Sequence, residues 1–145
     1  MFWLVIVSSV FLPQLTVAQS STELVNNPGF ETGDFTYWNA DANCAPIYKS
    51  TANPRSGDYC ARVGTTLSSG TLSQTCRIPR KSAATLSFWY SVGKGCSLEG
   101  KLIKSKDGSV IGSWSLTGET WKSRKHELDA SFANEEVTIE FTGTG

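Results

Sequence analysis

Apolar and polar residues alternate along much of the chain. The clearest case is the segment 84–92. Leu86, Phe88 and Tyr90 share one face of this segment, and Trp89 faces the opposite side. A period of two residues is typical of a β-strand with one buried face. Apolar content and the turn residues between segments predict further strands at 44–50, 58–63, 71–78, 96–104, 110–116, 121–128 and 137–141.

Turn residues separate these segments, and the resulting series of short strands indicates the fold class. Asp107-Gly108 supplies the positive φ angles that a tight hairpin needs, and Gly93 to Gly95 form another turn. No long window has helical periodicity. Roughly eight short strands that each bury one face are best accommodated in two packed antiparallel sheets. The sequence therefore predicts an all-β fold, an antiparallel β-sandwich of the jelly-roll type.

The amino-terminal residues have a different pattern. Trp3 to Leu12 form an apolar run that is too short to span a bilayer core of ~30 Å. Pro13 follows, and then the small residues Thr16, Val17 and Ala18, as a signal peptidase requires. We predict a signal peptide at 1–18, a mature chain of one domain at 19–145, and a secreted, extracellular product with no transmembrane segment.

Net charge and motif content exclude several function classes. Lys and Arg together number thirteen, as do Asp and Glu, so nothing favours nucleic acid or anionic lipid as a partner. The sequence has no G-x-S-x-G, no phosphate-binding glycine loop and no H-E-x-x-H. The single histidine, His126, lies in a Lys-His-Glu sequence typical of the exposed part of a strand. We therefore predict that the protein is not an enzyme.

Four cysteines, all in the mature part, predict a disulfide framework. An even number in a secreted chain indicates two disulfides, with three possible connectivities. Sequential pairing is favoured because it closes short loops, although the sequence leaves the choice open. The spacings do not match a zinc site. The residues are Cys44, Cys60, Cys76 and Cys96.

The segment 24–38, LVNNPGFETGDFTYW, is the most unusual in the chain. Asn-Asn-Pro-Gly is a strong turn signal, and aromatic residues crowd behind it. Such density predicts a segment that plugs the core. Glu31 and Asp34 flank Gly33, so their carboxylates are either solvated or able to offer oxygen ligands to Ca²⁺.

This segment resembles the entry motif of galactose-binding-like jelly rolls, the superfamily that contains many carbohydrate-binding modules. The spacing of Asn27, Gly29, Phe30, Glu31, Gly33 and Trp38 carries the resemblance. Later motifs follow in the order of that family, at 56–59, 72–74, 86–90, Trp121 and 137–141. The same series is similar to MAM domains of adhesion receptors. The resemblance implies a jelly roll in which the entry segment forms the first strand and the plug.

In both families another strand, with an Asp-Asp-Ile-like sequence, follows the strand that ends in Phe-x-Gly. This chain stops at Gly145, so the resemblance predicts a truncated domain that lacks its closing strand. A structural Ca²⁺ in these families often lies between the glutamate of the entry motif and the late aspartate. Glu31 is the ligand that carries over, and its partner is expected beyond Gly145.

Two functional hypotheses remain open. The first is a non-catalytic binding module that recognises carbohydrate or extracellular glycoconjugates, since sugar C–H faces stack on aromatic rings. Its candidate ligand-binding residues are Trp89, Tyr48 and Trp121, whereas Trp38, Tyr90 and Trp114 are expected in the core. The alternative is a structural or adhesive extracellular-matrix protein, including a skeletal matrix protein, that acts through protein–protein contacts as MAM domains do.

Overall fold

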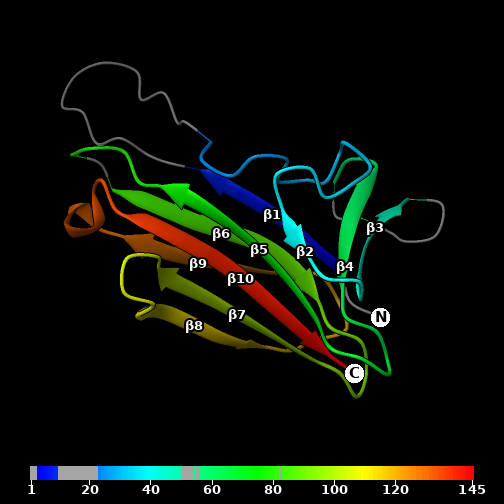
Figure 1. Ribbon diagram of the computed structural model, residues 1–145. Helices are drawn as coiled ribbons and strands as arrows, with labels where there is room; N and C mark the ends of the chain where they lie inside the picture. Colours follow the sequence, from blue (N-terminus) through cyan, green and yellow to red (C-terminus); the bar gives the residue numbers. More distant parts are fainter. Residues whose placement is uncertain (1–2, 10–22, 50–53, 55, 82) are drawn as a thin grey trace.

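The computed structural model describes residues 3–9, 23–49, 54, 56–81 and 83–145. Two five-stranded sheets pack face to face (Figure 1). Sheet I has the order β3 (Cys44–Tyr48), β4 (Tyr59–Val63), β1 (Trp3–Ser9), β6 (Ala84–Ser91) and β9 (Lys122–Leu128). Sheet II has the order β2 (Asn39–Ala40), β5 (Gly70–Arg77), β10 (Glu136–Thr144), β7 (Ser97–Lys104) and β8 (Val110–Leu116). The paired strands are antiparallel, so the predicted antiparallel β-sandwich is confirmed.

The core lies between the two sheets and follows the alternation in the sequence. Leu86 and Phe88 of β6 are buried, as are Ile139 and Phe141 of β10. The rings of Phe88 and Phe141 meet edge to face, with 5.0 Å between their centroids, and join the sheets at the centre. Burial of these apolar side chains is the main favourable contribution to folding, about 25 cal/mol for each Å² removed from water.

The entry segment 24–38 plugs the core, as predicted, but forms turns where a first strand was expected. Phe30 is fully buried and its ring lies 5.4 Å from that of Trp38. Asn27 and Phe30 have positive φ angles of 49° and 60°, which interrupt an extended backbone. The turn is closed by a hydrogen bond from Phe30 N to Asn27 O of 3.2 Å. The strand prediction is therefore wrong at this segment.

A buried glutamine fixes the entry segment to sheet II. The side-chain amide of Gln74 on β5 accepts a hydrogen bond from Asn26 N at 2.7 Å. Its Nε2 donates to Asn26 O at 3.0 Å. Both polar ends of the amide are satisfied, so its burial is not penalised.

Strand β1 occupies the middle of sheet I. It runs antiparallel to β6, with Trp3 opposite Ser91 and Ser9 opposite Thr85. It also pairs with β4, where Leu4 lies opposite Ala61. These residues belong to the range that the sequence predicts to be a removable signal peptide. Their removal remains a prediction.

Smaller departures from the sequence pattern have local causes. Val110 alternates with the buried Leu116 along β8 but is exposed, because the register between β7 and β8 shifts at Leu102 and Ile103. The loop after β9 contains a short 3₁₀ helix, η1 (Ala130–Phe132). None of the described residues forms a helix long and apolar enough to cross a membrane.

The four cysteines are free thiols, and the sequential disulfide pairing is incompatible with the sheet register. Cys44 lies opposite Val63, whereas Cys60 lies opposite Ile47, three positions along the same ladder. An odd separation places the side chains on opposite faces of the sheet, with their Cα atoms roughly 10 Å apart along the strand. A disulfide requires Cα atoms within about 7 Å.

The second pair is farther apart. Cys76 lies opposite Val137 on β10, whereas Ser97, the neighbour of Cys96, lies opposite Thr144. Seven residues of β10 separate these positions, which corresponds to roughly 23 Å. The preference for sequential pairing is therefore wrong, because short loops in the sequence do not bring these strand positions together.

Candidate functional site

Two of the predicted ligand-binding residues lie on one face of sheet I. Trp89 follows the buried Phe88 on β6 and therefore faces away from the core. It lies opposite Ser123 of β9, and continuation of the same register places Trp121 opposite Ser91. Trp89 and Trp121 are thus diagonal neighbours on the outer face, at the ~7–8 Å separation of such positions. Both side chains are partly exposed.

A row of polar side chains on β9 continues this surface. Ser123, Lys125 and Glu127 occupy alternate positions, and Lys125 Nζ lies 3.0 Å from Glu127 Oε1. The pair is largely exposed, so it contributes little to stability. We call Trp89, Trp121, Ser123, Lys125 and Glu127 the β6–β9 surface. It combines two indole rings with hydroxyl, ammonium and carboxylate groups.

Tyr48, the third predicted residue, lies elsewhere. Strands β4 and β1 separate its strand from β6. Tyr48 is opposite Tyr59, which packs against the core, so Tyr48 points to the opposite side of sheet I from Trp89. Its ring is 43% exposed and lies 5.2 Å from that of Tyr59. The structure does not bring Tyr48 together with the two tryptophans.

Charged groups flank the Tyr48 ring. Lys49 Nζ lies 5.7 Å from its centroid and 2.7 Å from Asp58 Oδ1. The hydrogen bond to Asp58 raises the pKa of Lys49, so the ammonium stays charged at neutral pH. This cation already lies near the ring, which makes Tyr48 a weaker stacking surface than the two indoles.

Glu31, the predicted calcium ligand, joins the entry segment to the start of β4. Glu31 Oε2 accepts a hydrogen bond from Asp58 N at 3.0 Å. Glu31 Oε1 accepts one from Tyr59 N at 3.2 Å. Peptide N–H groups thus satisfy both carboxylate oxygens.

Among the described residues, the surroundings of Glu31 contain no cluster of acidic side chains. Ca²⁺ takes six to eight oxygen ligands. No group of three or more acidic, histidine or cysteine side chains that could hold a metal occurs in the part of the chain that the structure describes. The nearby Asp58 carboxylate pairs with Lys49. Calcium binding therefore remains a prediction from the resemblance.

His126 faces the interior, contrary to the exposed position expected from its charged neighbours. It lies opposite the buried Leu86 and shares that inward face. Its ring packs edge to face on Trp114 of sheet II, with centroids 5.2 Å apart. A Cβ atom on Gly112 would lie 3.1 Å from His126 Cε1. The histidine thus packs between the sheets at their β8 and β9 edges.

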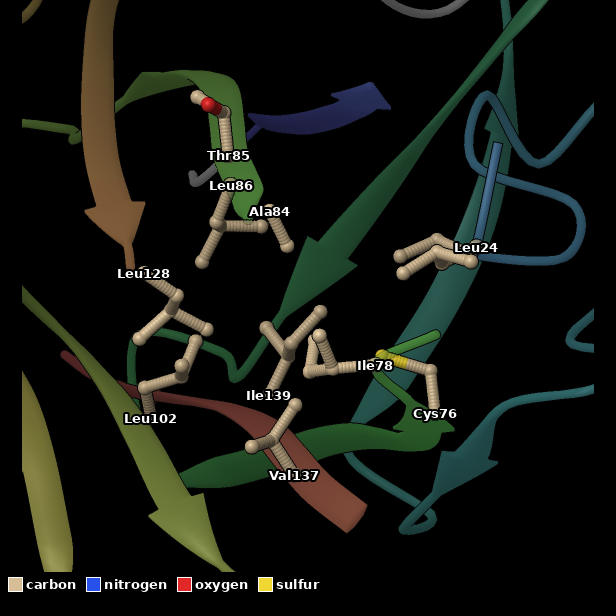
Figure 2. Close-up of a pocket in the computed structure, with 11 residues that line it drawn as sticks. Leu24, Cys76, Ile78, Ala84, Thr85, Leu86, Leu102, Leu128, Val137 and Ile139 are labelled. Carbon is tan, nitrogen blue, oxygen red and sulfur yellow. The ribbon is translucent and has the colours of Figure 1, made fainter. Parts of the chain in front are cut away.

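An apolar cavity lies between the sheets (Figure 2). Leu24, Ile78, Leu86, Leu102, Leu128 and Ile139 point into it, with Cys76 at one side. Its volume is about 20 Å³, which is room for little more than one water molecule. Burial raises the pKa of the Cys76 thiol to about 11, so this group is not a nucleophile at neutral pH. The cavity is a packing gap that is too small for a sugar ring.

A shallow depression of about 160 Å³ on sheet II is lined by polar residues of β7 and β8. Lys101 Nζ lies 4.0 Å from Glu99 Oε2 in this depression. Trp114 also lines it, but its ring packs against Phe88 in the core at 5.7 Å. Because the Trp114 ring packs against the core, this depression is a weaker candidate for ring stacking than the β6–β9 surface.

Tyr37 is an exposed aromatic residue that sequence reasoning did not select as a ligand contact. It is 66% exposed, more than Tyr48. It precedes the buried Trp38 and was counted only as part of the aromatic plug. The sequence could have indicated this exposure. Trp38 was expected in the core, and adjacent side chains in an extended segment point to different sides, so Tyr37 could be expected to face solvent.

Comparison with known structures places the fold among carbohydrate-binding modules. One similar structure is that of TmCBM61 in complex with β-1,4-galactotriose. The match covers 84% of this chain and 87% of the TmCBM61 chain, with a TM-score of 0.66 and 23% sequence identity. The CBM22-1 xylan-binding domain from Paenibacillus barcinonensis Xyn10C covers 79% of this chain and 85% of its own, with a TM-score of 0.50 and 11% identity.

A third similar structure is the enzymatically active domain of bacteriophage CBA120 tailspike protein 4. It matches 83% of this chain but only 19% of its own, with a TM-score of 0.58 and 12% identity. No protein-family model and no curated protein sequence matches the chain. The chain shares its β-sandwich fold with these structures, and the jelly-roll fold implied by the entry motif is confirmed.

Proposed function

We propose that this protein is a secreted, non-catalytic carbohydrate-binding module whose ligand stacks on the β6–β9 surface. The observation that carries the proposal is the placement of Trp89 and Trp121 on one outer face of sheet I. Two neighbouring indoles offer apolar faces to the C–H surfaces of successive sugar rings. Extracellular glycan is the partner of this site, and secretion follows from the predicted signal peptide.

The polar row on β9 suits the hydroxyl groups of such a ligand. Ser123 donates and accepts hydrogen bonds, Lys125 donates and Glu127 accepts. Sugar-binding sites use a few such groups to orient a ligand that apolar surfaces hold. A β-linked hexose polymer is the first class to test, because TmCBM61 was solved with β-1,4-galactotriose.

The test is affinity electrophoresis in native gels that contain β-1,4-galactan, xylan or no polysaccharide. We expect the wild-type protein to be retarded by at least one polymer. Trp89→Ala and Trp121→Ala should each weaken binding about two- to tenfold, because a stacked ring contributes ~0.5–1.5 kcal/mol. Leu67→Ser serves as a control, since Leu67 is 94% exposed and lies outside the surface.

Far-UV circular dichroism of each variant separates lost binding from lost folding. Retardation of folded tryptophan variants equal to that of the wild type would exclude the β6–β9 surface. A wild-type protein that binds no polysaccharide but retains matrix proteins would instead support the adhesive alternative.

A further inference from the structure

Tyr37 adopts a backbone conformation that usually belongs to glycine or asparagine. Its φ angle is 72°. It lies in the turn from Phe35 to Trp38, which is closed by a hydrogen bond from Trp38 N to Phe35 O of 2.8 Å. Thr36 does not have a positive φ, so the turn has the type II pattern, whose third position requires one. A residue with a β-carbon is strained there.

Burial of the Tyr37 ring does not compensate this strain, because the ring is 66% exposed. The residues on either side are the ones held by the core. Phe35 packs edge to face on Phe30 with centroids 5.8 Å apart, and Trp38 is buried. The fold thus keeps a large aromatic ring in solvent at a position where a smaller residue is preferred. Strain of this kind is concentrated at functional sites.

The turn that carries Tyr37 is rigidly held. Asn27 Nδ2 donates to Thr32 Oγ1 at 2.7 Å, to Asp34 O at 3.2 Å and to Thr36 O at 3.3 Å. Asp34 Oδ1 accepts a hydrogen bond from Thr36 N at 2.9 Å. The backbone under the ring is therefore fixed before any ligand arrives. Such pre-organisation lowers the entropy lost on binding.

The residues close to Tyr37 in the chain are polar. Asp34, Thr36 and Asn39 are all exposed. Hydrogen bonds from Thr36 and Thr32 lower the pKa of Asp34, so its carboxylate is charged at neutral pH. Asp34 Oδ1 accepts hydrogen bonds from Thr32 Oγ1 at 2.7 Å and from Thr36 N at 2.9 Å. Exposed carboxylate, hydroxyl and amide groups on the same turn as an exposed aromatic residue are groups that can bind the hydroxyls of a sugar.

We propose that Tyr37 is the stacking residue of a second carbohydrate-binding site, formed by the turn 35–38 and its polar neighbours, that takes the C–H face of one hexopyranose ring. The proposal rests on the proposed function but on different elements. The turn leads into β2 at the edge of sheet II, whereas the β6–β9 surface belongs to sheet I. One polysaccharide chain or two separate chains then engage the module at two places.

Isothermal titration calorimetry of the full chain with β-1,4-galactotriose measures the number of sites. We expect two sites per wild-type molecule and one site in Tyr37→Asn, while Tyr37→Phe retains both. A Trp89→Ala, Trp121→Ala double variant should also retain one site, the one at Tyr37. Leu67→Asn is the matched control for loss of an exposed apolar side chain and should retain both.

Thermal unfolding supplies a readout that a purely structural tyrosine would not give. Asparagine accepts positive φ, so Tyr37→Asn should melt at the same temperature as the wild type or a few degrees higher while it loses its site. A single wild-type site that disappears in the double tryptophan variant and persists in Tyr37→Asn overturns this proposal and leaves the proposed function intact. A Tyr37→Asn protein that melts lower and binds two trisaccharides also overturns it. A wild-type protein that binds no trisaccharide overturns both proposals for this sugar class.

Discussion

Glu31 lies so close to Gly57 that a Cβ atom on Gly57 would be 2.2 Å from Glu31 Oε1. Gly57 also has a φ angle of 68°, which disfavours any other residue. The glycine in the turn before β4 thus lets the entry segment dock on sheet I. This contact connects the most distinctive stretch of the sequence to the sandwich.

The first prediction concerns this contact. Gly57→Ala should lower the free energy of unfolding by about 2 kcal/mol or more, because backbone strain adds to displacement of the Glu31 carboxylate. Urea unfolding monitored by tryptophan fluorescence measures the loss. Gly95→Ala is the matched control, since Gly95 has a φ of 77° and open space around it. Equal losses in the two variants would show that the close approach to Glu31 contributes nothing.

The second prediction separates hydrogen bonding from calcium binding at Glu31. Glu31→Ala should lose about 1 kcal/mol of stability, because the N–H groups of Asp58 and Tyr59 lose their acceptor. The hydrogen bonds alone predict the same loss in calcium and in EDTA, measured by thermal unfolding. A wild-type melting temperature that rises with calcium, together with no rise in the variant, would establish the cation site implied by the resemblance.

The third prediction concerns thiol chemistry. Burial raises the pKa of Cys60 to about 12 and that of Cys44 to about 11. In the native state both should therefore react slowly with a disulfide reagent at pH 8 and faster as the pH approaches these values. Denatured protein should react rapidly at all four cysteines. Rapid native labelling at pH 8 in the Cys44→Ser, Cys96→Ser, Cys76→Ser variant would contradict the burial of Cys60.

The same shifts set a pH dependence of stability. A thiol with a raised native pKa holds its proton after the unfolded chain, with a pKa near 9, has released it. The unfolded state then binds fewer protons, so stability falls as pH rises. The stability that these two buried thiols contribute is fully present below about pH 9. It is lost between pH 9 and the native pKa values of about 11 to 12. Urea unfolding at pH 7, 9 and 10.5 checks the sign, and Cys60→Ala should reduce the slope.

The fourth prediction concerns β1. A chain that begins at Gln19 lacks the strand between β4 and β6. It should melt at a lower temperature than the full chain and self-associate, because two strand edges become unpaired. Thermal unfolding and size-exclusion chromatography measure both effects. An equal melting temperature for the two chains would show that β1 does not contribute to the stability of sheet I.

Strand positions were predictable because each strand buries one face. The segment 110–116 coincides with β8, and 84–92 differs from β6 by one residue. In contrast, β2 has only two residues, too few for any periodicity. The Asn-Asn-Pro-Gly turn was predicted, but the first strand implied by the resemblance was wrong, because the positive φ of Phe30 is a tertiary effect in which ring burial outweighs local backbone preference.

The faces of the site residues required the register between strands. Trp89 was expected to face outward from its own alternation, and its neighbour Trp121 followed only from the β6–β9 pairing. Tyr48 faces the other way because it lies opposite Tyr59. His126 illustrates the same point, since its charged neighbours suggested exposure while its partner Leu86 places it inside.

Strand β1 also sets an order of events during synthesis. Its partner β6 lies about eighty residues later in the chain, so sheet I cannot close until 85–91 have left the ribosome. At ~5–20 residues per second this interval is roughly 4 to 16 s. Throughout that time the apolar segment has no strand partner on β6. A receptor for the predicted signal peptide would therefore meet this segment before β6 is available to pair with it.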